Sequence, residues 1–169
     1  MSYLTMNNEK LLPVVIELNT LLADYNMYYQ KLRSYHWNIL GKNFFDLHKK
    51  FESLYTDARL KIDEIAERIL TLRYHPMSKY SDYINISSIK ETTPLLTDKQ
   101  MIKEIIKDHK KLLAQMKVIL KHAENAEDEG TIDLLGAYIR ELEKVTWMLD
   151  AWIKDTKDQL NSSMIKTLS

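Results

Sequence analysis

Apolar residues recur at steps of three and four along four long segments of this 169-residue chain. This spacing places apolar side chains on one side of an α-helix, because the helix completes a turn in ~3.6 residues. The segments that show it are 8–38, 43–73, 97–124 and 131–160. The chain has only 3 Gly and 3 Pro, so few residues are available to interrupt helices. We therefore expect an all-α protein in which four long helices bury their apolar stripes in a bundle.

Turn and capping signals mark the ends of these helices. Gly41 separates the first two, and Asn43 is suited to cap the second. Pro76 prevents the second helix from continuing. Thr97 followed by Gln100 is a capping-box signature for the third helix.

The rest of the chain consists of one long connection and two tails. Residues 77–96 are too many for a simple turn, so we expect a crossing connection with a short helix of its own. The polar tails 1–7 and 161–169 are expected to be mobile. No internal repeat is visible, and the sequence predicts a single domain over residues 1–169.

Composition excludes several classes of protein. The 24 basic and 24 acidic residues balance, which argues against a protein-wide basic field for nucleic acid. The chain has no Cys, so disulfides, zinc thiolate sites and iron–sulfur clusters are excluded, and His and carboxylates must bind any transition metal. No apolar run approaches ~20 residues, so we expect no transmembrane helix. The N-terminus lacks the pattern of a signal peptide, and a cytoplasmic location is expected.

The helix expected over 43–73 carries a second stripe beside its apolar one. With Phe51 set at zero and ~100° per residue, its core-facing residues fall within about 60°. Four residues able to bind metals fall between about 60° and 160°, on one flank: His48, Glu52, Asp63 and Glu67. Phe45 and Leu70 lie at the two ends of this flank, which is unusual for a merely solvated surface.

The four residues form two separate pairs. At a rise of ~1.5 Å per residue, the middle of the His48–Glu52 pair lies about 22 Å from the middle of the Asp63–Glu67 pair. Metal–ligand bonds are about 2 Å long, so the pairs cannot share an ion within one chain. An antiparallel two-fold partner, with its axis beside Asp57 and Ala58, would bring the His48–Glu52 pair of one chain against the Asp63–Glu67 pair of its mate. Two equivalent sites per dimer would result.

His36 is expected to join the histidine end of this site. It ends the first helix, and it lies almost as far before Gly41 as His48 lies after it. In a helical hairpin such positions face each other. The assembled site would contain two histidines and three carboxylates. This mixed nitrogen and oxygen set, without thiolate, suits non-haem iron or another first-row divalent ion.

Ordinary structural roles remain open for the same residues. His36 ends an apolar stripe and can be a hydrogen-bonded core residue. The carboxylates can be solvated charges or partners of nearby cations: Lys49, Arg59 and Lys61. Of the other histidines, His109 fits a core stripe, His122 is expected to be exposed and His75 lies in a loop. No E-x-x-H motif occurs, so the di-iron site of the usual ferritin-type bundle interior is absent.

Three blocks of the sequence carry a family resemblance: "HWNILGKNFFDLHKKFESLY", "DEIAERIL" and "TIDLLGAYIRELEKVTWMLDAW". They resemble the Dps family, the ferritin-like mini-ferritins, and the likeness covers nearly the whole chain except its tails. The resemblance implies a ferritin-like four-helix bundle with a short helix in the middle connection, assembled into a hollow dodecameric shell. It also implies oxidation of Fe(II), preferably by hydrogen peroxide, storage of ferric mineral, and protection against oxidative damage.

The resemblance also assigns residues to the ferroxidase site at the two-fold interface. One subunit supplies three ligands and its mate two, around two iron positions: His36, His48 and Glu52, with Asp63 and Glu67 from the mate. The family often has Asp where Glu52 stands, so the carboxylate here has a longer reach. Trp37 resembles the family's aromatic residue beside the site, and we expect it either to intercept stray oxidising equivalents or simply to pack.

The family also suggests where metal enters the cage. An acidic run precedes the last helix, in the region that lines three-fold pores in the family: Glu127, Asp128, Glu129 and Asp133. Three copies would focus cations, whereas capping of the helix N-terminus is the alternative explanation. Many members compact DNA through basic tails. The first ten residues here offer only Lys10 and the last nine only Lys166, so weak or absent DNA binding is expected.

These observations lead to one main functional hypothesis and two alternatives. The main hypothesis is a ferroxidase and iron-storage cage that uses hydrogen peroxide. The first alternative is a nucleoid-associated cage that protects DNA physically. The second is a metal-free helical oligomer with a structural role.

Overall fold

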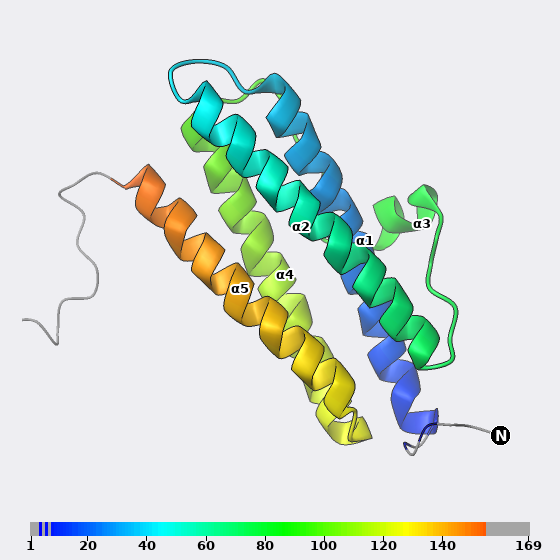
Figure 1. The fold of residues 1–169 in the computed structure, drawn as a ribbon. Helices are drawn as coiled ribbons and strands as arrows, with labels where there is room; N and C mark the ends of the chain where they lie inside the picture. Colours follow the sequence, from blue (N-terminus) through cyan, green and yellow to red (C-terminus); the bar gives the residue numbers. More distant parts are fainter. Residues whose placement is uncertain (1–3, 5, 7, 155–169) are drawn as a thin grey trace, which may run out of the picture.

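The computed structural model describes Leu4, Met6 and residues 8–154. The helices in this part of the chain are α1 (Asn8–Asn38), α2 (Phe44–Thr71), α3 (Tyr80–Ile86), α4 (Asp98–Ala126) and α5 (Glu129–Ile153). No strand occurs among these residues, which confirms the all-α prediction. The four long helices form the bundle, and α3 is the short helix expected in the connection (Figure 1).

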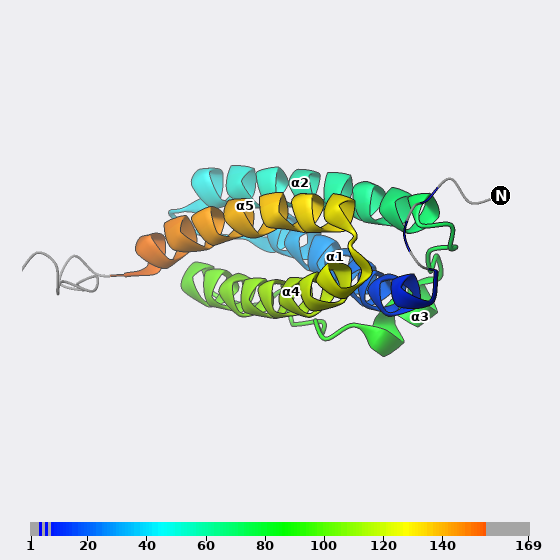
Figure 2. The ribbon, with the colours of Figure 1, turned by 90° about the horizontal axis from the view of Figure 1, so that it is seen from below.

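The bundle consists of two antiparallel hairpins joined by a crossing connection. α1 packs against α2, α3 and α4, and α4 packs against α5. The segment between α2 and α4 returns along the bundle past α1, so α2 and α4 run in the same direction (Figures 1 and 2). Gly41 in the first hairpin has φ 99°, a left-handed conformation that glycine adopts without steric cost.

The helix boundaries agree closely with the periodicity. α5 begins two residues earlier than expected and ends at Ile153, where Lys154 is extended; residues 155–160 of the predicted helix lie outside the described part. Leu4 and Met6 of the predicted N-terminal tail pack against the core. The remainder of that tail, apart from these two residues, and the whole tail 161–169 lie outside the described residues.

One capping prediction is confirmed and another is wrong. Thr97 and Gln100 form the reciprocal capping box at the start of α4. Asn43 occupies the N-cap position of α2, but its side chain does not cap the helix. Its Nδ2 donates instead to Asp98 Oδ2 over 2.6 Å. This hydrogen bond ties the α1–α2 turn to the start of α4.

The core follows the predicted stripes and contains a buried ion pair. Its largest fully buried side chains include Tyr25, Tyr35 and Phe51. Lys31 Nζ lies 2.6 Å from Asp108 Oδ2, and both side chains are less than 5% exposed. No helix within residues 8–154 combines the length and apolarity needed to cross a membrane.

His109 is fully buried, as its place in the stripe predicts, whereas His122, expected to be exposed, is half-buried. Burial, with a smaller contribution from the positive charge of Lys50, lowers the pKa of His109 to about 3. The unfolded chain takes up a proton at this histidine below its ordinary pKa of ~6.5, but the folded chain does not. Stability is therefore lost as the pH falls from about 6.5 towards 3.

This histidine should make the protein acid-sensitive. We expect protonation of His109 in the unfolded chain to lower the unfolding free energy by roughly 1.4 kcal/mol for each unit that the pH falls between about 6 and 4. Urea unfolding of a His109→Gln variant at several pH values should show a shallower decline than the native chain. His75→Gln, in an exposed loop, is the matched control and should keep the native slope. Equal slopes for the native chain and His109→Gln would contradict this expectation.

Candidate metal centre

The first hairpin brings two histidines into contact, as predicted. The rings of His36 from α1 and His48 from α2 are stacked, with centroids 3.7 Å apart and an interplanar angle of 18°. His36 Nδ1 lies 2.8 Å from the backbone oxygen of His48, and His48 Nδ1 lies 2.9 Å from the backbone oxygen of His36. A carbonyl oxygen only accepts, so each Nδ1 carries the proton. In the neutral imidazole each Nε2 then carries the lone pair, as a metal-binding imidazole requires.

Two aromatic rings pack against this histidine pair, and neither contact was predicted from the sequence. Phe44 stacks on His48 with centroids 4.9 Å apart, and Tyr55 meets the ring of His36 edge-on at 5.3 Å. Phe44 lies one helical turn before His48, and Tyr55 lies two turns after it. The rule that residues one turn apart are neighbours on a helix could have identified Phe44 as a supporting residue.

The three candidate carboxylates lie on the exposed side of α2: Glu52, Asp63 and Glu67. Within the described part of the chain, their side chains have neither an ion pair nor a hydrogen bond. Lys61 does not neutralise them, because its ammonium group binds Asp57 at 2.6 Å and Glu141 at 2.9 Å. Lys49 and Arg59 likewise form no ion pair with any described residue. Among the residues that the structure describes, these three acids therefore form none of the ion pairs of the alternative explanation.

One chain alone does not bring the two halves of the candidate site together. α2 is continuous from Phe44 to Thr71, so the separation of about 22 Å between the two pairs persists. His48 and Glu52 lie in the first half of α2, near the α1–α2 turn, and Asp63 and Glu67 lie towards its other end. Figure 1 shows that α2 runs unbroken between these two ends. Among the residues described, no group of three or more His, Asp or Glu is placed to hold a metal ion.

The flank that carries these residues also exposes large apolar side chains. Phe45 is 77% exposed and Leu70 is 49% exposed, at the two ends of the flank. Trp37, beside His36, is 58% exposed, and the guanidinium of Arg33 lies over its ring at 4.7 Å. Exposed aromatic and aliphatic residues along one side of a helix indicate an interaction surface.

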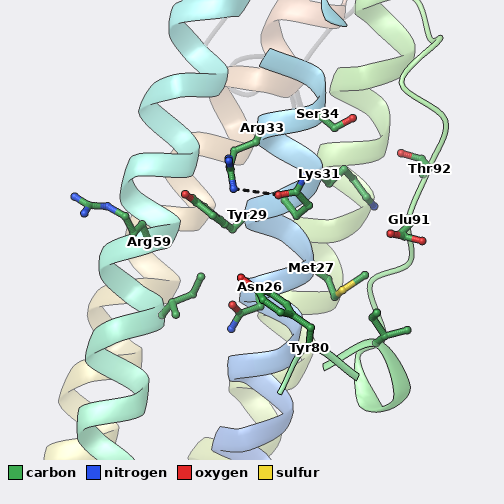
Figure 3. A pocket seen from close by; sticks show the side chains of 13 residues that line it. Asn26, Met27, Tyr29, Lys31, Arg33, Ser34, Arg59, Tyr80, Glu91 and Thr92 are labelled. Atoms are coloured by element: carbon green, nitrogen blue, oxygen red, sulfur yellow. Dashed lines mark hydrogen bonds between the residues drawn. The ribbon is translucent and has the colours of Figure 1, made fainter. Parts of the chain in front are cut away.

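A cavity of about 420 Å³ opens beside the middle of the same flank. Figure 3 shows its walls, with Tyr29 and Arg33 from α1, Arg59 from α2 and Tyr80 from α3. Arg59 lies roughly midway along α2 between the two ligand pairs. The cavity therefore adjoins the place where the sequence puts the two-fold axis.

The acidic run around the start of α5 divides into one buried and three exposed side chains. Asp128 is fully buried and caps α5, accepting from the backbone N–H of Thr131 at 3.0 Å and from its hydroxyl at 2.6 Å. The guanidinium of Arg68 also donates to Asp128. The capping explanation thus holds for Asp128, whose carboxylate is not available to a pore. The other members of the run are exposed: Glu127, Glu129 and Asp133.

Comparison with known proteins gives a consistent result. A ferritin-like domain family model matches residues 16–158. DNA protection during starvation protein 2 from Bacillus anthracis is 42% identical over 140 residues, which cover 83% of this chain and 96% of that protein.

Solved structures show the same fold. The Dps protein from Vibrio cholerae O1, described as a member of a broad superfamily of ferritin-like diiron-carboxylate proteins, is 44% identical with a TM-score of 0.88. The match covers 91% of this chain and 97% of the Vibrio cholerae chain. A Dps protein from Bacillus brevis is 38% identical with a TM-score of 0.85, covering 88% of this chain and all of that chain (100%). The ferritin-like fold is confirmed, and this chain belongs to the Dps family of ferritin-like proteins.

Proposed function

We propose that this protein oxidises Fe(II) with hydrogen peroxide at sites shared between two antiparallel copies, and that it stores the ferric product inside a dodecameric cage. The observation that carries the proposal is the stacked His36–His48 pair, in which both Nε2 atoms are free to bind a metal. Membership of the Dps family and the diiron-carboxylate superfamily named for the Vibrio cholerae relative support iron as the substrate.

The proposed site is completed by the partner copy. An antiparallel mate places its acidic pair against the histidine end of the first chain, giving one complete ligand set: His36, His48 and Glu52, with Asp63 and Glu67 of the mate. This arrangement would also cover the exposed apolar side chains at both ends of the flank. The three carboxylates have no ion pair or hydrogen bond with any described side chain, which supports this arrangement, because such acids are available as ligands.

The ligand set suits the oxidation of iron in pairs. Carboxylate oxygens are hard donors that favour Fe(III) over Fe(II), so they promote electron loss. Neutral imidazoles complete the coordination without adding negative charge. Two Fe(II) ions each give one electron, and peroxide with two protons becomes two molecules of water. Because both electrons arrive together, no hydroxyl radical is released.

Iron is proposed to enter the cage through openings lined by the exposed acids Glu127, Glu129 and Asp133. Three copies of these side chains around a three-fold axis would concentrate cations at the opening. Asp128 takes no part in this role, because it is buried under Arg68.

A direct experiment follows the reaction and locates the metal. Anaerobic Fe(II) titrated with hydrogen peroxide should be consumed at two irons per peroxide, without a spin-trapped hydroxyl radical. Anomalous scattering from an iron-soaked crystal should then place two irons between copies. Iron held within a single chain would contradict the shared site, and absence of both uptake and oxidation would favour the metal-free structural oligomer.

The DNA-binding alternative makes a different prediction. Affinity for the phosphate backbone scales with the number of cationic contacts, and the tails supply few. Lys10 lies in the first turns of α1, whereas Lys166 lies outside the described residues. We expect no gel shift of linear DNA at ~0.15 M salt and only weak retention at ~0.05 M. Retention at the higher salt would favour the nucleoid-associated cage.

A further inference from the structure

A tyrosine and a histidine form a buried pair in the bundle interior, apart from the proposed iron site. The Tyr28 hydroxyl lies 2.7 Å from His109 Nε2, and His109 Nδ1 lies 2.7 Å from Thr146 Oγ1. The Thr146 hydroxyl donates to the backbone oxygen of Leu142 at 2.6 Å, so it must accept from His109 Nδ1–H. His109 Nε2 is therefore unprotonated, and the Tyr28 hydroxyl donates to it.

This hydrogen bond gives Tyr28 a chemistry that its neighbour lacks. A phenol that loses an electron becomes a strong acid, and His109 Nε2 is placed to take its proton directly. Burial holds the pKa of Tyr28 well above its usual value, so the phenol stays protonated until it is oxidised. Tyr25 packs edge-on against Tyr28 at 6.2 Å, but its buried hydroxyl has no hydrogen-bond partner among the described residues. Oxidised Tyr25 would have no base to receive its proton.

A series of aromatic contacts leads from the histidine pair towards Tyr28. Tyr55 meets the ring of His36 edge-on at 5.3 Å, and Tyr29 meets Tyr55 edge-on at 6.0 Å. Tyr28 is the next residue to Tyr29 in α1. The ring contacts end at Tyr29, because neighbouring residues on a helix point in directions about 100° apart, so the last step to Tyr28 crosses the backbone between the two adjacent residues.

The positive charge of Arg33 makes the rings of Trp37 and Tyr29 unfavourable sites for the oxidising equivalent. Its guanidinium lies 4.7 Å from the Trp37 ring and 5.2 Å from the Tyr29 ring. A cation is attracted to a neutral aromatic ring but repels a ring that has become positively charged. A positive charge on Trp37 or Tyr29 is therefore destabilised, whereas Tyr28 becomes neutral once its proton has moved to His109.

We propose that Tyr28 and His109 act as a redox pair that accepts an oxidising equivalent escaping from the iron site through Tyr55 and Tyr29. The inference rests on the proposed function, because the oxidant is a hydroxyl radical formed when a lone Fe(II) reduces peroxide. That radical gains one electron from Tyr28 and one proton from solvent, and becomes water. Tyr28 loses its electron, and its O–H proton passes to His109 Nε2, leaving a neutral phenoxyl radical and an imidazolium. A further Fe(II) can return the electron.

The test is a radical measurement on the assembled full-length protein. Samples given less than one Fe(II) per site and excess peroxide are frozen within milliseconds to seconds and measured by electron paramagnetic resonance. The native chain should show a tyrosyl radical with the g-value of a hydrogen-bonded phenoxyl. Tyr28→Phe should abolish this signal. His109→Gln, which cannot accept a proton, should abolish it or shorten its lifetime.

Two variants serve as matched controls. Tyr25→Phe removes a hydroxyl without a partner, and Tyr138→Phe removes one that donates to Glu64 at 2.5 Å. Both should retain the signal, and size-exclusion chromatography shows whether every variant assembles. A signal that survives in Tyr28→Phe would overturn the inference. So would a signal that is lost in Tyr138→Phe or Trp37→Phe while Tyr28→Phe retains it.

A photochemical arm separates this inference from the proposed function. A ruthenium polypyridyl complex, oxidised by a laser flash with an added quencher, supplies the oxidising equivalent to metal-free protein. The late radical should again depend on Tyr28 and His109. Failure of iron oxidation with a Tyr28-dependent photochemical radical would contradict the ferroxidase alone. Normal iron oxidation without a Tyr28 radical in either arm would overturn the redox pair alone.

Discussion

Two inactive variants of this chain are expected to restore each other's iron oxidation when they assemble together. The first, His36→Ala/His48→Ala, keeps the acidic pair but lacks both imidazoles. The second, Asp63→Asn/Glu67→Gln, keeps the imidazoles but lacks the acidic pair. Loss of even a supporting residue of a metal ligand weakens metal sites 10–100-fold, so each variant alone should lose activity by on the order of 10²-fold or more.

A mixed dimer has one complete site. It takes imidazoles from one chain and acids from the other, while its second site lacks both. Equal mixing before assembly makes half of the dimers mixed, and half of their sites complete, so about a quarter of the native rate should return if sites follow the two-fold rule. Stopped-flow oxidation of Fe(II) by peroxide measures the rate, and native mass spectrometry with an isotope-labelled chain measures the mixed fraction.

The control is the same pair of variants mixed after each has assembled separately, which should stay inactive. A His75→Ala/His122→Ala chain should keep the native rate, because neither histidine belongs to the candidate ligand set: His75 lies in the loop after α2 and His122 near the end of α4. If verified mixed dimers stay inactive, the ligands do not come from two chains. If either variant alone is fully active, its altered residues are not ligands.

The fold was accessible from sequence because its determinants are local and periodic. Two signals involve only residues a few helical turns apart, and the structure confirms both: the apolar stripe through Phe51 and Ile65, and the capping box at Thr97. The antiparallel hairpin follows from a glycine between two amphipathic segments. It places His36 and His48 side by side without any long-range information.

Features that depend on contacts between distant segments were not accessible. Asn43 has the residue type of a helix cap, but its side-chain amide donates a hydrogen bond to Asp98 of another helix instead. Asp128 has the residue type of a pore acid, but Arg68 of α2 approaches from 60 positions away and buries it. The tautomers of the histidine pair follow from reciprocal backbone contacts that spacing cannot predict.

The ion pair between Lys31 and Asp108 also depends on a contact between distant segments, and its loss should have the largest effect on stability. The two residues are 77 positions apart, and their side chains are almost fully buried. Burial raises the pKa of the Asp108 carboxyl, and the hydrogen bond and charge of Lys31 lower it. A Lys31→Met variant leaves a buried carboxylate without its cation. Such losses destabilise proteins by about 3–5 kcal/mol.

Chemical unfolding at one fixed protein concentration measures this effect, since assembly also contributes to stability. Without Lys31 the Asp108 pKa rises further above its unfolded value, so the folded variant binds a proton more readily than the unfolded chain. The deficit should therefore be greatest at neutral pH and shrink as the pH falls towards the folded pKa.

A Lys31→Met/Asp108→Leu variant should recover most of the lost stability, because no charge is then buried. Lys107→Met, which breaks the exposed pair with Glu104, is the matched control and should change stability by less than about 1 kcal/mol. Equal effects of Lys31→Met and Lys107→Met would show that burial does not set the strength of the Lys31–Asp108 pair.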